Sequence, residues 1–170
     1  MRDYVPDPWV GQMPRIDIQA AFLLLGRFGG SEDDAPNFAG AKLCGTVASG
    51  CRFRYAYFVG ADLAGAVFIG GDLSDALFQH ADLNRTLLAS CNLARTRLAH
   101  ADLANAYVGD ADFTSADFTD ANLQGVDFAE AVLTDAIWPK DVTVPEGWVS
   151  DPDSGRLRRA DPEETDTQSV

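Results

Sequence analysis

Basic residues are scarce in this sequence. Its 170 residues include 13 Lys and Arg against 26 Asp and Glu, which gives a formal net charge of −13 at pH 7. A protein that neutralises nucleic-acid phosphates or anionic lipid head groups needs a surplus of basic side chains. The shortage argues against direct binding to DNA, to RNA or to an anionic membrane surface. We therefore expect the partner to be another protein.

Long hydrophobic runs and paired cysteines are also lacking. The longest apolar run, from Ala20 to Leu25, is far too short to span a bilayer, and no basic segment of a signal peptide precedes it. The three cysteines, Cys44, Cys51 and Cys91, are odd in number and have no spacing typical of metal ligands. We interpret them as small apolar residues in a reducing compartment. Together these features predict a cytoplasmic protein.

Motifs for catalysis and for cofactor binding are missing as well. The sequence has no Gly-rich phosphate loop followed by Lys, no G-x-S-x-G and no paired His–Glu zinc motif. We expect a protein that is not an enzyme and that binds no cofactor or metal.

A five-residue pattern fills most of the chain instead. A large apolar residue, the centre of each unit, recurs at every fifth position from Phe38 to Trp138, with Ala48 as the exception. Two positions earlier stands Ala, Gly, Cys or Thr, except at Pro36 and Val126. A period of five fits a solenoid whose coil has four sides, each side being one pentapeptide. The large and small residues should point inward, and Gly at the ends of early units suits corners with positive φ.

Folding the pattern by twenty stacks residues twenty positions apart, with about 4.8 Å between coils. One outward column is then apolar, which suggests an interface with a partner or with a second copy of the chain. Its members are Val47, Val67, Leu87 and Tyr107, with Ile69 on the same side. Alternatively, the N-terminal arm or the C-terminal tail covers this column.

Carboxylates accumulate in the second half of the pattern. Residues 99–138 contain eight acids and no Lys or Arg, whereas residues 36–98 contain four acids and six bases. We hypothesise an acidic partner-binding face made of Asp62, Asp82, Asp102, Asp112, Asp117 and Asp120. Alternatively, Asp only follows the repeated pattern and stays solvated.

Charged neighbours are also expected between coils. The stacking predicts four ion pairs: Lys42–Asp62, Arg52–Asp72, Arg97–Asp117 and Arg95–Asp75. His80 and His100 should stack at one corner with Asp120 beyond them, which we interpret as a hydrated corner rather than a metal site.

The units ADLAG, GDLSD, ADLNR, CNLAR, ADLAN, ADFTS and ANLQG resemble the pentapeptide-repeat family, whose consensus is A(D/N)LXX. The resemblance covers about residues 36–138, and the segments RIDIQAAFLLLGR and WPKDVTVPEGW resemble the flanks of some actinobacterial members. It implies an all-β fold, a right-handed quadrilateral β-helix, and the number of centres gives about five four-sided coils.

The other segments predict caps at the two ends. We expect an N-terminal arm and a short capping helix in residues 1–35, and the β-helix in residues 36–138. Residues 139–160 should form a small C-terminal hairpin, with residues 142–149 as a strand and Trp148 covering the last coil. Residues 161–170 are expected to be a disordered tail.

Two functional hypotheses follow. The first is a non-enzymatic adaptor or scaffold that binds a protein through flat solenoid faces. The second comes from the resemblance, since some family members mimic DNA, bind DNA gyrase and confer resistance to gyrase poisons. It implies a modulator of DNA gyrase or topoisomerase IV, and the acidic second half fits it. The sequence shows no hydrophobic C-terminal helix of the kind that dimerises those members.

Overall fold

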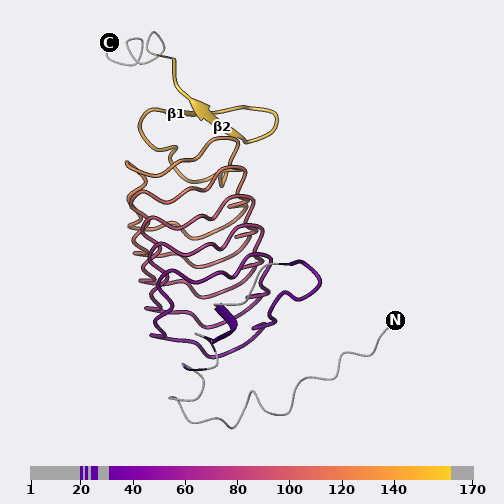
Figure 1. Cartoon of the computed structure of the whole chain (residues 1–170). Coiled ribbons are helices and arrows are strands. Elements are labelled where there is room, and N and C mark those ends of the chain that lie inside the picture. Colours follow the sequence, from indigo (N-terminus) through magenta and orange to yellow (C-terminus); the bar gives the residue numbers. More distant parts are fainter. Residues whose placement is uncertain (1–19, 21, 23, 27–30, 162–170) are drawn as a thin grey trace.

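The repeated tract folds as a stack of coils. The computed structural model describes residues 20, 22, 24–26 and 31–161. Parallel bridges join residues twenty positions apart, the first between Asn37 and Tyr57 and the last between Asp117 and Ile137. Figure 1 shows the coils lying one above another, with strands β1 and β2 at the C-terminal end. Four pentapeptides therefore make one turn of the solenoid, as the period of five predicts.

Backbone hydrogen bonds to the coils on either side and within the corner hold each pentapeptide. Around Phe58, the N–H of Tyr57 donates to the carbonyl of Pro36 in the coil below (3.0 Å). The N–H of Phe58 donates to the carbonyl of Leu77 in the coil above (2.7 Å). The N–H of Ala61 then donates back to the carbonyl of Phe58 (3.0 Å) and closes the corner. The stack thus satisfies its own backbone polar groups, which allows its interior to be apolar.

The last residue of nearly every unit occupies the left-handed backbone region. Six early corners contain Gly there, as predicted: Gly40, Gly45, Gly50, Gly60, Gly65 and Gly70. Later corners contain other residue types in the same conformation, including His80 (φ 60°) and Arg85 (φ 56°). A side chain disfavours this region by roughly 1–2 kcal/mol. The stack itself therefore imposes the corner conformation, whatever residue stands there.

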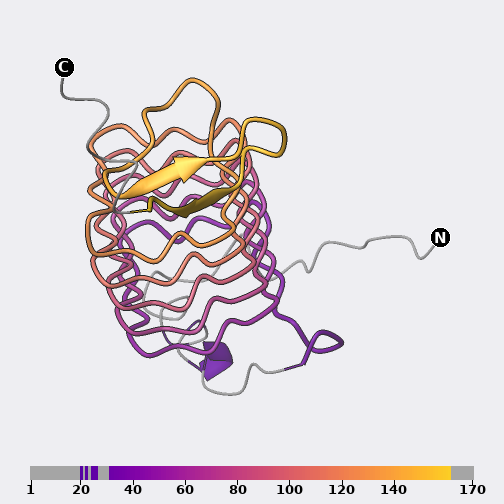
Figure 2. The same cartoon turned by 90° about the horizontal axis from the view of Figure 1, so that it is seen from above.

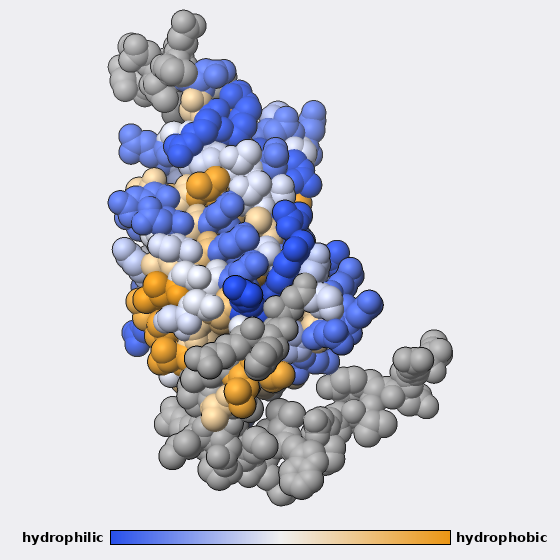
Figure 3. Space-filling model, in the orientation of Figure 1, coloured by the Kyte–Doolittle hydropathy of each residue, from blue (hydrophilic) through white to orange (hydrophobic). Residues whose placement is uncertain are grey.

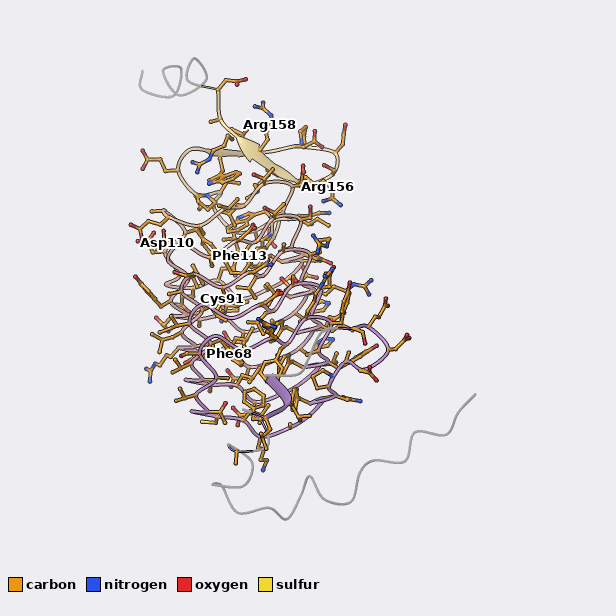
Figure 4. All side chains as sticks on the ribbon, viewed as in Figure 1. Phe68, Cys91, Asp110, Phe113, Arg156 and Arg158 are labelled. Atoms are coloured by element: carbon orange, nitrogen blue, oxygen red, sulfur yellow. The ribbon has the colours of Figure 1, made fainter. Side chains whose placement is uncertain are left out.

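The inward side chains form one continuous core along the axis. The ring of Phe58 stacks between those of Phe38 and Phe78, with centroid distances of 5.1 and 4.8 Å. Figure 4 shows Phe68 and Phe113 inside the stack, and both are fully buried. These columns of buried rings and aliphatic chains fix the register of one coil on the next, because a slip would expose them.

A hairpin closes the C-terminal end of the stack. Strand β1 (Trp148–Ser150) pairs antiparallel with β2 (Leu157–Arg159). The N–H of Leu157 donates to the carbonyl of Ala136 in the last coil (2.9 Å), and Trp148 is buried. Figure 2 shows the hairpin lying across the end of the coil. The first strand begins later than expected, because the N–H of Trp148 closes a turn onto the carbonyl of Pro145 (3.1 Å).

The N-terminal end is described only in part. The expected arm lies outside the described residues, as does the expected tail after Asp161. Of the expected capping helix, residues 20, 22 and 24–26 are described, and they are helical. Phe22 is buried with its ring 4.6 Å from that of Phe53, and the carbonyl of Gly26 accepts the N–H of Arg52 (2.7 Å). Within the described part of the chain, no helix has the length and hydrophobicity needed to cross a bilayer.

The stack departs from its regular pairing near Val126. Tyr107 is bridged to Leu87 in the coil below, but no bridge joins Tyr107 to Asp127 among the described residues. Val126 stands at the inward position that the regular units give to a smaller residue, and it is only partly buried. A valine needs more room than alanine at a close-packed position, which accounts for the loss of pairing at this side of the last coil.

Candidate interaction surfaces

Three aspartates stack on one side of the solenoid, as the sequence predicts. Parallel bridges join Asp62 to Asp82 and Asp82 to Asp102, and Asn122 continues the column. The amide of Asn122 donates to Oδ1 of Asp102 (2.8 Å). Like charges therefore face one another over three successive coils, at some cost to stability.

Each of these carboxylates is also a part of its own turn. The Oδ1 of Asp62, Asp82 and Asp102 accepts the backbone N–H two residues later, at 3.2, 3.0 and 3.0 Å. That N–H precedes the corner and has no backbone acceptor in the ladder, so Asp or Asn satisfies it. The second position of the repeat therefore has a structural reason to be Asp or Asn, which supports the alternative that Asp follows the pattern.

The six aspartates of the hypothesised acidic face do not lie on one side of the solenoid, so this hypothesis is wrong about which residues belong together. Asp112 lies in another column, bridged to Asn92 and Val132. Asp117 lies in a third column, bridged to Arg97 and Ile137, and Asp120 is at a corner. A side of the coil recurs only every twenty residues, so aspartates ten or fifteen positions apart belong to different sides. The acidic residues surround the stack, and only Asp62, Asp82 and Asp102 share a column.

The apolar column is continuous in space. Bridges join Val47 to Val67, Val67 to Leu87, and Leu87 to Tyr107. Ile69 is on the same side, at the corner where its carbonyl accepts the N–H of Gly50. We call these five residues the apolar ladder. Leu87 is 36% exposed, Ile69 41% and Tyr107 57%. Figure 3 shows that hydrophobic side chains gather toward the N-terminal half of the visible face, while hydrophilic ones prevail elsewhere.

Of the four predicted ion pairs, one is formed. Arg95 binds Asp75 through two hydrogen bonds, Nε to Oδ1 at 2.7 Å and Nη2 to Oδ2 at 2.9 Å. The other three pairs are ladder neighbours, but no ion pair joins their charged groups in the described chain. The reason is local for Asp72 and Asp117, whose carboxylates bond instead to the N–H and hydroxyl of the residue two positions later.

Sequence reasoning missed a second partner of Asp75. The Nε of Arg54 donates to Oδ2 of Asp75 at 3.1 Å, and its guanidinium lies 4.6 Å from the centre of the Tyr55 ring. Arg54 and Asp75 are twenty-one positions apart, so folding by twenty does not pair them. Asp75 is at a corner, where its side chain is not used by its own turn and can accept both guanidinium groups.

Asp75→Asn is expected to lower the free energy of unfolding by about 1 kcal/mol at pH 7, because it removes the charge that two guanidinium groups share. The hydrogen bonds from Arg95, with those from Arg54, lower the pKa of Asp75. A carboxyl with a lowered pKa in the folded state stabilises the protein above its unfolded pKa of about 3.9. That stabilisation is lost as the pH falls through the folded value.

Urea unfolding of wild type and variant between neutral and acid pH measures this effect. Asp135→Asn, three coils further along the same corner column, is the matched control because Asp135 forms no ion pair within the described residues. A difference between wild type and Asp75→Asn that stays constant down to strongly acid pH would contradict the assignment.

The two histidines stack as expected. Their ring centroids are 4.9 Å apart with an interplanar angle of 5°, and Nδ1 of His100 lies 3.7 Å from Oδ2 of Asp120. In the described chain, no three His, Cys, Asp or Glu side chains are grouped in a way that could hold a metal ion.

The inward cysteines are not reactive groups. Cys51 and Cys91 are buried and unpaired, and the thiol of Cys91 donates to the carbonyl of Phe68 (2.9 Å). Burial raises the pKa of Cys51 to about 12 and that of Cys91 to about 11. Both therefore remain thiols at neutral pH, and a thiol is a poor nucleophile compared with a thiolate.

Comparisons with known proteins concern the repeat tract. The model of the pentapeptide repeat region matches residues 61–138, and the model of pentapeptide repeats in eight copies matches residues 37–70. Together the two matches run from residue 37 to residue 138, which is more than half of the chain. No curated protein matches the sequence.

Solved structures of similar proteins include a pentapeptide repeat protein from the thylakoid lumen of Arabidopsis thaliana. It is 24% identical, with 68% of this chain and 79% of that chain covered and a TM-score of 0.43. A pentapeptide repeat protein from Nostoc is 24% identical, with 73% and 87% covered and a TM-score of 0.36. QnrB1, a plasmid-mediated fluoroquinolone resistance protein, is 20% identical, with 64% and 58% covered and a TM-score of 0.35. The family matches and the twenty-residue ladder agree, and the chain belongs to the pentapeptide-repeat family.

Proposed function

We propose that the chain is a protein-binding module without enzymatic activity, and that a partner covers its apolar ladder. The observation that carries this proposal is the stacking of Val67, Leu87 and Tyr107 over successive coils, with Ile69 beside them. Single exposed hydrophobic residues are ordinary, whereas a contiguous row rimmed by polar side chains is typical of an interface.

The regularity of the stack favours binding over catalysis. The backbone of each coil is fixed by bonds to the coils on either side, so the ladder is a flat and pre-organised surface. A rigid surface loses little conformational entropy when a partner covers it. Each large apolar side chain that becomes fully buried contributes about 1.5–3 kcal/mol. The partner can be another protein or a second copy of this chain.

Leu87→Asp is expected to weaken partner binding or self-association at least tenfold, because it places a charge in the middle of the ladder. Gln124→Asp, an equal change of charge on another side of the solenoid, is the matched control. Capture from a native cell extract compares the proteins retained by wild type and by both variants, and sedimentation equilibrium of the purified chain measures self-association. Equal binding by wild type and Leu87→Asp, with the fold intact, would show that the ladder is not the interface.

A second candidate function is the modulation of a type II topoisomerase by DNA mimicry. The observation that favours it is the segment 99–138, which has eight carboxylates and no Lys or Arg. A narrow, acidic rod is complementary to a basic DNA-binding channel. Against it, only three of the proposed aspartates share a column, and they bond to their own turns.

A gyrase supercoiling assay, with and without a gyrase poison, tests this candidate. If it is correct, micromolar protein inhibits supercoiling or protects the enzyme, and Asp102→Asn, Asp112→Asn and Asp117→Asn combined abolish the effect. Asparagine keeps the Oδ1 acceptor that each turn uses, so the triple variant removes charge while leaving the corners intact. An absence of inhibition and of protection would exclude the topoisomerase function.

A further inference from the structure

The loss of regular pairing near Val126 leaves a pocket at the C-terminal end of the solenoid. Its volume is about 510 Å³, and it lies between the last coil and the segment that leads to β1. The last coil contributes Leu123, residues 126–129 and Trp138, and the facing wall is residues 142–146. A cavity of this size suits a small organic molecule.

The walls of the pocket are largely apolar and are held in place. Phe128 and Trp138 meet edge to face, with ring centroids 5.1 Å apart at an interplanar angle of 77°. The Nε1–H of Trp138 donates to the carbonyl of Val142 (3.2 Å), which ties the facing segment to the last coil. Leu123 and Val144 are among the other apolar residues of the lining. The pocket is therefore built from packed side chains of the core rather than from a loop alone.

Both charged residues that line the pocket are acidic. Asp127 accepts the N–H of Ala129 through Oδ1 (3.0 Å), and its Oδ2 has no hydrogen-bond partner within the described chain. Glu146 belongs to the other wall, and its carboxylate forms no ion pair with any described residue. Both residues are exposed. Among the lining residues there is no Lys, Arg or His to neutralise them. An open pocket with apolar walls and two exposed carboxylates at its edge favours a ligand that is apolar with a positive end.

We propose that this pocket binds a small organic cation with an apolar body, such as an arylalkyl amine. The aromatic or aliphatic body packs against Phe128, Trp138 and Leu123, while the ammonium group lies between Asp127 and Glu146. The face of an aromatic ring also attracts an ammonium group within about 6 Å, which adds to the preference for a cation. The site is separate from the apolar ladder and does not depend on the protein-binding function proposed above.

Titration of the full chain with phenethylammonium tests this site, with phenethyl alcohol and phenylpropionate as neutral and anionic probes of similar shape. In NMR spectra, the methyl signals of Leu123, Val126 and Val144 are expected to shift with the ammonium probe. The dissociation constant should be at least tenfold lower for the ammonium probe than for the alcohol, and the carboxylate probe should not bind. Absence of methyl shifts at millimolar ammonium probe would overturn the proposal without any variant being made.

Two variants then locate the site. Ala129→Phe fills the pocket from an exposed position and should weaken binding of the ammonium probe at least tenfold. Asp127→Asn with Glu146→Gln should remove the preference for the ammonium probe over the alcohol, while Asp120→Asn, outside the pocket, should leave it unchanged. Binding that is equal in wild type and in a folded Ala129→Phe variant would overturn the assignment. Leu87→Asp should not alter probe binding, so failure of the ladder hypothesis and failure of this one are distinguishable.

Discussion

Phe58→Ala is expected to lower the free energy of unfolding by about 3–5 kcal/mol, which is a large share of the total stability of a domain of this size. The side chain is 0% exposed, and its ring stacks on Phe38 and Phe78 with interplanar angles of 18° and 5°. It also meets Phe53 and Phe68 edge to face at 5.8 and 6.2 Å. Such ring pairs add to the contribution from buried area.

The rigid backbone of the solenoid explains why the expected loss of stability in Phe58→Ala is large for a core substitution. The backbones above and below Phe58 are fixed by ladder bonds at 2.7–3.0 Å, so the walls of the new cavity have little freedom to collapse. The penalty of a large-to-small change grows with the volume that stays empty. In a solenoid each coil contacts only its neighbours, so the loss should be strongest in the first coils.

Chemical denaturation measures the total loss, and native-state hydrogen exchange measures where it occurs. Tyr57→Ala is the matched control, since Tyr57 is next in sequence but 40% exposed, and it should cost less than about 1 kcal/mol. We expect the amide of Leu63 to exchange faster in Phe58→Ala, with a much smaller change at Phe118. An equal loss in the two variants would show that the aromatic column does not carry the stability of the core.

The inward-facing side chains of the structure could be predicted from the sequence, because their placement depends only on large apolar residues repeated at a fixed spacing. Large apolar residues five apart can be buried together only if the chain turns at every unit, and this single constraint places Phe58 over Phe38. The apolar ladder follows from the same folding by twenty. No detail of side-chain conformation is needed for either prediction.

The contacts of the outward-facing side chains could be predicted only in part, because each polar side chain has several possible hydrogen-bond partners. Asp62 and Asp72 each have a basic residue in the coil below, but the N–H two residues later is nearer and always present. The spacing gives the column and not the direction in which the carboxylate points. Arg54 is paired with Asp75, which is twenty-one residues away. Folding by exactly twenty does not place these two residues in one column, so it does not predict this pair.

Val126 shows how an exception to the pattern becomes a feature of the surface. A valine at a position for a smaller residue is visible in the sequence, and the structure places the unpaired side of the last coil there. That this yields a pocket with two carboxylates depends on the path of residues 139–147, which no repeat determines. The proposed pocket therefore lies where the repeat ends or is broken, whereas the apolar ladder follows the regular repeat.

Gly71→Ala is expected to lower the free energy of unfolding by about 2–3 kcal/mol, although the repeat consensus has Ala at this position. Consensus substitutions commonly stabilise a protein, and Ala111 and Ala131 occupy the same inward column without difficulty. At Gly71, however, a Cβ atom would lie 2.7 Å from the Sγ of Cys51 and 2.9 Å from the carbonyl oxygen of Phe68. The Sγ of cysteine extends beyond the Cβ, where alanine has no atom, so the cysteine below takes the space that the glycine leaves.

A double-mutant cycle shows whether the cost of Gly71→Ala comes from the contact with Cys51 or from any side chain at position 71. Cys51→Ala removes the closer contact, so Gly71→Ala should cost about 1 kcal/mol less in that background than in the wild type. Part of the cost should persist, because the carbonyl of Phe68 remains and also accepts the N–H of Gly71 (2.8 Å). Urea unfolding of the four proteins measures the coupling. If the free-energy costs of the two substitutions are additive, or if Gly71→Ala stabilises the protein, the contact with Cys51 is not the reason for glycine at this position.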